Sequence, residues 1–282
     1  MNGLGGRDAW VAQMAAARAL RAIIDVASKA AVELVAVKGA VTSFLLYDDV
    51  SERPLGDVDV RIRPTDRVVL RNAALTKGFQ VLEDGGPYDK LTLAFGDIAV
   101  DVECHVGAPY MTAMTVDDLL RAAVTVRHPQ GFAVRVPDTA HHAFVLAVNC
   151  FKDKLADVTP WAREDTKRIV LVSDFSVERL VKVAREARAH TLLYLVAEHF
   201  AGRGPLDPSS VVWKEVCGTL EKGTRRGYVA AYHTLEPRAR AGALFRALTR
   251  VASDWPLAWP LALERALAFE RSRRRSQRDN RR

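Results

Sequence analysis

The stretch RPLGDVDVRI, residues 53–62, reads as a strand that carries two acids. Side chains two positions apart on a strand point to the same face, so Asp57 and Asp59 project together, roughly 6.6 Å apart along the strand. The apolar residues that alternate with them take the opposite face and predict a core side. Two carboxylates at this separation repel one another unless a cation lies between them. The stretch therefore indicates either a metal site or a solvated acidic face.

A second acidic strand, IAVDVECHV at 98–106, has the same alternation. It places Asp101, Glu103 and His105 on one face. If this strand lies beside the first, a third carboxylate joins Asp57 and Asp59. Three carboxylates on neighbouring strands are able to hold two metal ions for an in-line attack on phosphorus, and Mg²⁺ prefers such oxygen ligands. The alternative is an edge hairpin whose acids face water. Either Asp101 or Glu103 fits the third position.

Three further residues suit a phosphate group. Lys38 and Gly39, in VKGA, stand where a short strand gives way to a helix. A glycine at such a junction lets backbone N–H groups approach an anion, and the helix N-terminus adds its dipole. Arg53 precedes the acids by four residues and suits a phosphate or Asp57 as its partner. Each signal taken alone is equally explained by a common turn or a surface cation.

The hydrophobic pattern predicts an α/β front half and an all-helical back half. Turn and proline signals separate the front-half segments, and Gly96-Asp97 is typical of a two-residue hairpin. From 138 onward apolar residues recur at helical spacing, and His141 and His142 are expected to open a helix and pack. The front-half helices are expected at 8–31, 39–49 and from Thr65 to Gly78, and the strands at 33–39, 56–64, 79–83, 90–95, 98–106 and 132–137.

Composition and charge narrow the class of protein. The 282 residues are 49% hydrophobic and 27% charged, which is typical of a globular chain. No apolar run is long enough to span a bilayer, the first residues do not resemble a secretory signal, and three separated cysteines fit a cytoplasmic location. Residues 270–282 hold seven arginines against two acids, which accounts for five of the seven net positive charges. This Arg-rich tail is expected to be disordered, with contact to RNA or another polyanion as an alternative role.

The combination of KG, R-P-L-G-D-V-D-V and a later acid-x-His strand resembles the nucleotidyltransferase superfamily of the DNA polymerase β type. More closely, it is similar to its bacterial branch of nucleotidyltransferase family proteins. The resemblance covers about residues 30–205. It implies an α/β (α+β) fold with a mixed sheet flanked by helices, divided into a catalytic domain at 1–137, a helical domain at 138–269 and the tail at 270–282.

The resemblance also implies roles for individual residues. Asp57, Asp59 and Glu103 match metal ligands, with Asp101 as a rival third acid, and either Glu103 or Asp101 is a candidate for the proton acceptor. Nucleotide contacts match Lys38, Gly39 and Arg53, and, from the helical half, Lys154 and Asp165. The chain departs from the superfamily in having Gly39-Ala40 where Gly-Gly or Gly-Ser is usual.

The implied activity is metal-dependent transfer of an NMP from an NTP to a hydroxyl, with release of pyrophosphate. Two Mg²⁺ ions are expected, with Mn²⁺ as an alternative, and the NTP, ATP among the choices, is a substrate. The acceptor stays open between RNA such as a tRNA end, a protein and a small alcohol. The main alternative is a non-catalytic module that binds a nucleotide or RNA, and a carboxylate-based hydrolase is a third.

Overall fold

The computed structural model describes residues 6–49, 52–85, 90–108, 111–153, 155, 158–202 and 207–235, together with 254, 260 and 263. The chain forms two compact units. The first comprises the described residues of Met1–Val106, Thr115–Leu146 and Thr159–Ser176. The second comprises those of Gly107–Met114, Ala147–Val158 and Val177–Arg282. The units thus alternate along the chain, whereas the sequence predicted one boundary between 137 and 138.

A five-stranded mixed sheet forms the centre of the first unit, in the order β1-β2-β5-β4-β3. Strand β2 runs parallel to β5, and the other neighbours are antiparallel. The predicted hairpin at Gly96-Asp97 is confirmed, since Phe95 pairs with Ile98 on either side of it. The strands are β1 (Val35–Val37), β2 (Asp57–Arg61), β3 (Gln80–Gly85), β4 (Lys90–Phe95) and β5 (Ile98–Glu103).

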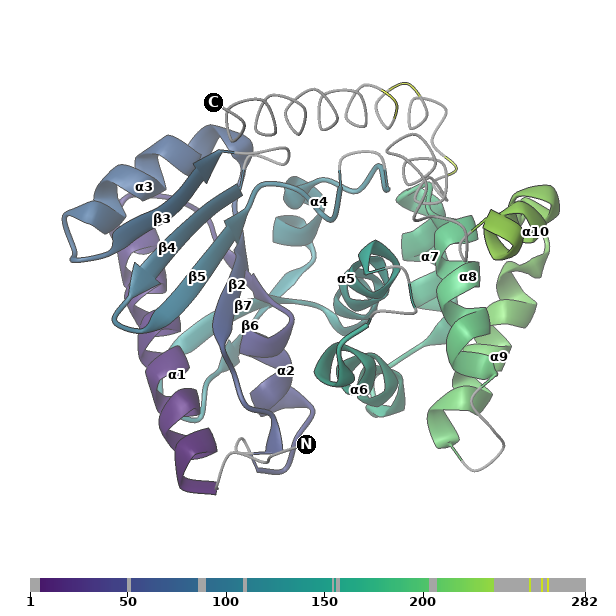
Figure 1. Ribbon diagram of the computed structural model, residues 1–282, viewed down its shortest axis with the longest axis horizontal. Coiled ribbons are helices and arrows are strands. Elements are labelled where there is room, and N and C mark those ends of the chain that lie inside the picture. Colours follow the sequence, from purple (N-terminus) through teal and green to yellow (C-terminus); the bar gives the residue numbers. More distant parts are fainter. Residues whose placement is uncertain are drawn as a thin grey trace, which may run out of the picture. The chain divides into compact units, whose positions relative to one another are not determined.

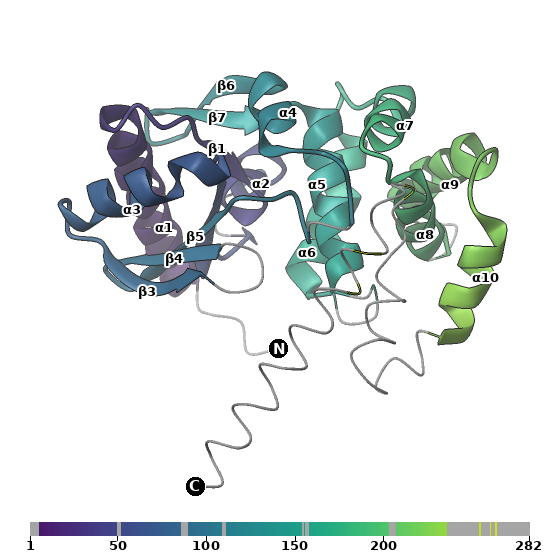
Figure 2. The same ribbon diagram turned by 90° about the horizontal axis from the view of Figure 1, so that it is seen from above.

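Helices α1 (Gly6–Lys29) and α3 (Arg67–Leu75) lie along one face of this sheet (Figures 1 and 2). The side chains that meet them are the apolar residues predicted to be buried. Val58 and Val60 of β2 and Val100 and Val102 of β5 are fully buried in this core. Because side chains alternate along a strand, the residues between these valines face the other side of the sheet. The α/β fold class with a mixed sheet and flanking helices is therefore confirmed.

The first unit also contains a second, smaller sheet and several helices. A separate two-stranded sheet pairs β6 with β7, and only the second of these strands was predicted. Helix α4 and strand β6 were missed because both are short, at six and five residues. The elements are α2 (Gly39–Leu45), the 3₁₀ helix Pro64–Asp66, α4 (Val116–Arg121), β6 (Ala123–Arg127), β7 (Ala133–Pro137), α6 (Pro160–Arg168) and the 3₁₀ helix Ile169–Leu171. Helix α5 (Thr139–Lys152) begins in the first unit and continues into the second from Ala147.

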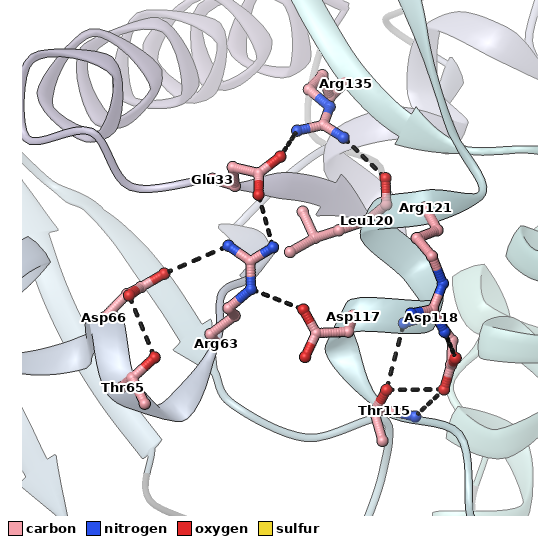
Figure 3. Close-up of polar contacts among 10 residues, drawn as sticks. All are labelled: Glu33, Arg63, Thr65, Asp66, Thr115, Asp117, Asp118, Leu120, Arg121 and Arg135. Carbon is pink, nitrogen blue, oxygen red and sulfur yellow. Dashed lines mark hydrogen bonds and ion pairs between the residues drawn. The ribbon is translucent and has the colours of Figure 1, made fainter.

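A chain of exposed ion pairs joins the ends of several of these elements (Figure 3). Arg63, just after β2, donates to Glu33 and to Asp117 of α4, each over 2.6 Å. Arg135 of β7 donates to the other oxygen of Glu33 over 2.8 Å and to the Leu120 carbonyl over 2.7 Å. Hydrogen bonds from the two arginines lower the pKa of Glu33. Exposed pairs contribute about 0–1 kcal/mol each, so this chain of contacts serves alignment more than stability.

The described part of the second unit is mainly helical, as predicted for the back half of the chain, with short non-helical segments such as 107–108 and 111–114. Its core includes the ring of Trp213, which is fully buried and stacks on Phe200 at 5.6 Å between centroids. Its helices are α7 (Val177–Glu186), α8 (His190–Ala201), α9 (Pro208–Glu221) and α10 (Arg226–Leu235). The predicted Arg-rich tail at 270–282 lies outside the described residues, as do most of the helices expected beyond 238. Among the described helices none combines the length and apolar character needed to cross a bilayer.

His142 in helix α5 makes the stability of the protein dependent on pH. Its side chain is 1% exposed, and burial lowers its pKa to about 4 despite the opposing charge of Asp165. Below pH 6.5 the His142 side chain binds a proton in the unfolded chain but stays neutral in the folded protein. The contribution of neutral His142 to the free energy of unfolding is therefore fully present above pH 6.5. It decreases as the pH falls towards 4, by about 1.4 kcal/mol per pH unit.

We expect urea unfolding of the wild type to show this loss between pH 7 and pH 5, and His142→Gln to show a smaller one. Some loss remains in the variant, because burial also lowers the pKa of His128 to about 4. His141→Gln is the matched control, since His141 is the neighbouring residue on α5 and is only partly buried. An unchanged pH slope in His142→Gln would contradict the assignment.

Candidate functional site

Strands β2 and β5 bring the predicted acids onto one face of the sheet. Their parallel register pairs Asp59 with Asp101, and Asp57 lies two residues earlier on the face that Asp59 shares. The face is the one opposite the valine core. The condition on which the sequence prediction depended, that the two acidic strands are neighbours, is therefore met. Three carboxylates from adjacent strands therefore share this face.

The three aspartates differ in their surroundings. Asp57, at the start of β2, is exposed, whereas Asp59 is 6% exposed. Desolvation and the nearby charge of Asp59 together raise the pKa of Asp57, and Lys38 opposes this shift. Burial is the larger cause of this shift, and the repulsion between Asp57 and Asp59 adds to it. This face thus favours the arrival of further positive charge.

Asp101 is held by two residues of β4 that the sequence prediction did not include. Thr92, its partner in register, donates a hydrogen bond over 2.9 Å. The Lys90 ammonium lies 3.0 Å from the other carboxylate oxygen. Both residues share a face with Asp101, and strand alternation within KLTLAF places them there once the hairpin is recognised.

Glu103, the other candidate for the third acid, is paired with Arg61. The two residues are partners in the β2–β5 register, and their side chains meet at 2.5 Å. The Arg61 side chain is only 2% exposed. Strand β5 ends at Glu103, so His105 lies beyond the strand on which the sequence placed it. Arg61 was missed by sequence reasoning, although its spacing from Asp57 and Asp59 puts it on the same face.

The Lys38 side chain contacts the acids of this face. Its ammonium lies 2.6 Å from an oxygen of Asp59 and 3.8 Å from one of Glu103. Although burial alone lowers the pKa of Lys38, the charges of Asp59 and Glu103 raise it above its ordinary value. The sequence predicted a phosphate contact for this lysine.

Gly39 is the first residue of helix α2 and lies close to the guanidinium of Arg53. A Cβ atom at Gly39 would lie 2.9 Å from the Arg53 guanidinium and 3.0 Å from Leu55, closer than side chains tolerate. A larger residue here would have to displace the side chain of Arg53 or of Leu55. The Arg53 guanidinium thus lies beside the N-terminal end of α2, a neighbour of Gly39 that the sequence analysis did not anticipate.

A buried carboxylate on helix α6 holds this arginine. Asp165 is 1% exposed and accepts hydrogen bonds from Arg53 at 3.0 and 3.2 Å, from Tyr47 at 2.7 Å and from Thr42 at 2.9 Å. The indole of Trp161, also on α6, faces the guanidinium at 5.6 Å. The sequence predicted a nucleotide contact for Asp165. Its oxygens are instead enclosed, so its contact is with Arg53.

The donor set suits a hard divalent cation in its chemistry, because aspartate oxygens are the ligands that Mg²⁺ prefers. As the side chains stand, no three His, Cys, Asp or Glu residues within the described ranges are close enough together to hold a metal ion. Asp59, Asp101 and Glu103 instead each contact a basic side chain. Lys154, the remaining predicted contact, lies outside the described residues.

A family model described as "Uncharacterised nucleotidyltransferase" matches residues 7–202, more than half of the chain. The chain belongs to this nucleotidyltransferase family. The matched range contains every residue assigned above to the acidic face and to the Arg53–Asp165 cluster. The resemblance drawn from the sequence motifs is therefore confirmed, and the protein is an enzyme of the nucleotidyltransferase class.

Two solved structures are also similar to this nucleotidyltransferase, and no curated protein matches it significantly. A solution structure of the antibiotic-resistance factor ANT(2'')-Ia has 17% identity and a TM-score of 0.43, covering 61% of this chain and 89% of the other. A crystal structure of ANT(2'')-Ia in complex with adenylyl-2''-tobramycin has 16% identity and a TM-score of 0.45, covering 61% and 97%.

Proposed function

We propose that this nucleotidyltransferase transfers an NMP from an NTP to a hydroxyl group with the help of Mg²⁺ held by Asp57, Asp59 and Asp101. The observation that carries the proposal is the register of β2 and β5, which sets Asp59 directly opposite Asp101 with Asp57 on the same face. Mn²⁺ is an alternative ion. When bound, such ions neutralise phosphate charge and make an acceptor hydroxyl easier to deprotonate.

Asp101 is preferred to Glu103 as the third ligand. Glu103 faces the buried Arg61 at 2.5 Å, and separating that pair would leave a buried guanidinium without its carboxylate. The Lys90 partner of Asp101 is one-third exposed, so it exchanges for another cation at little cost. We therefore propose that Glu103 holds Arg61 in place and that Asp101 is the third ligand of the ion.

The phosphates of the NTP are assigned to the Gly39 turn and to Arg53. A guanidinium suits phosphate because its planar donors match two oxygens at once. Arg53 keeps a side chain that is 12% exposed, and Asp165 fixes its orientation. The bond that forms joins the acceptor oxygen to the α-phosphorus, and the bond that breaks releases pyrophosphate. The hydroxyl proton passes to a carboxylate of this face, for which Asp101 and Glu103 are the candidates.

The acceptor is open between an RNA end, a protein hydroxyl and a small alcohol. We expect the full chain, incubated with each α-labelled NTP, Mg²⁺ and a fractionated cell extract, to transfer label to one fraction and to release pyrophosphate. Treating that fraction with nuclease or protease then identifies the acceptor class. The matched control replaces Mg²⁺ with EDTA. Nucleotide binding that needs no metal and gives no labelled product with any fraction would contradict the proposal.

A further inference from the structure

The backbone of Lys38 adopts a conformation that lysine rarely takes. Its φ of 54° and ψ of −138° lie in a region where glycine is the usual residue, because a Cβ atom crowds the neighbouring backbone. Such strain persists only where the surrounding structure imposes it, and it is concentrated at functional sites. A glycine here would relieve the strain but would remove the side chain. Lysine at this position therefore differs from the less strained glycine in supplying an ammonium group.

The ammonium of Lys38 lies between carboxylates of two adjacent strands. It is 2.6 Å from Asp59 on β2 and 3.8 Å from Glu103 on β5, and the side chain is only 15% exposed. Lys90 approaches the same face from β4, where it lies 3.0 Å from Asp101. Two of the three carboxylates assigned to Mg²⁺ thus already contact a lysine. The described residues contain no preformed cluster of three metal-ligand side chains.

We propose that Lys38 is an internal counter-ion of the metal site, whose ammonium compensates Asp59 in the metal-free enzyme and is displaced from it when the divalent ion binds. The inference rests on the proposed function, since it needs the acidic face to be the metal site. It also differs from the phosphate contact predicted by sequence. A phosphate ligand acts on the nucleotide and leaves metal affinity in the absence of nucleotide unchanged, whereas a counter-ion competes with the metal directly.

The test measures Mn²⁺ binding without nucleotide, by calorimetry and by loss of the free-ion EPR signal. Lys38→Met removes the competing charge, so we expect Mn²⁺ to bind about tenfold more tightly than to the wild type. We also expect a lower Tm than the wild type in EDTA and a larger rise in Tm on adding Mn²⁺. Lys38→Arg keeps a cation in place and should retain affinity near that of the wild type.

Two further variants keep the test decisive. Lys38→Gly removes the same charge while relieving the backbone strain, so it replaces Lys38→Met if that variant fails to fold. Lys77→Met is the matched control, because Lys77 is exposed after helix α3 and away from the acids. Equal Mn²⁺ affinity in wild type, Lys38→Met and Lys38→Gly would overturn the inference and leave the proposed function standing. Absence of Mn²⁺ binding in all of them would overturn the metal site itself.

Discussion

Replacing Asp59 with Asn is expected to lower kcat/KM for NMP transfer by about a thousandfold or more. Asp59 is the central acid of the site, in register with Asp101 and sharing a face with Asp57. The amide keeps the shape of the side chain but removes the charge that we propose holds a divalent ion. The loss should appear at every Mg²⁺ concentration, because neither of the flanking acids replaces the ligand between them. The measurement is pyrophosphate release with the acceptor found in the labelling experiment.

The control for this variant is Asp97→Asn, at the exposed turn between β4 and β5. It makes the same chemical change on the same sheet but outside the acidic face, and its activity should equal that of the wild type. Circular dichroism and Tm should show that Asp59→Asn stays folded. Full activity of Asp59→Asn in a folded sample would refute the metal assignment, and an equal loss in Asp97→Asn would show that the effect is not specific.

The acidic face was predictable because its pattern is local. Strand alternation fixes which side Asp57 and Asp59 occupy, and the Gly96-Asp97 turn fixes how β4 meets β5. The adjacency of β2 and β5 was stated only as a condition, since parallel neighbours far apart in sequence carry no local signal. Arg61 followed the same alternation, yet its near-complete burial depends on Glu103 across that pairing.

The cluster around Asp165 was not predictable in the same way. Its partner Arg53 lies 112 residues earlier, and Thr42 and Tyr47 are even more distant along the chain. Helical periodicity indicates where α6 runs but not which element its Asp165 meets. An acidic residue on a helix of polar composition is usually exposed to solvent. Here the charge of Asp165 is buried, and three side chains from the segment around α2 donate hydrogen bonds that compensate it.

Asp165→Asn is expected to lower the free energy of unfolding by about 3 kcal/mol, because it leaves the Arg53 charge without its carboxylate in a largely buried place. The same change frees Arg53 from the orientation proposed for phosphate binding, so KM for the NTP should rise more than kcat falls. Urea unfolding and steady-state kinetics measure the two effects. Tyr47→Phe, which removes one hydrogen bond to the same carboxylate, should lower the free energy of unfolding by only about 1 kcal/mol.

A double-mutant cycle separates the pair from its surroundings. Arg53→Met with Asp165→Asn removes both charges, so no buried charge remains unpaired, and the double variant should be less destabilised than the sum of the single changes. Glu164→Gln is the matched control, because it alters the preceding residue of α6 at an exposed ion pair with Arg168. Additive losses would show that Asp165 stabilises the helix independently of Arg53. A rise in KM that is the same in Arg53→Met and in the double variant would show that Asp165 acts on the nucleotide through Arg53.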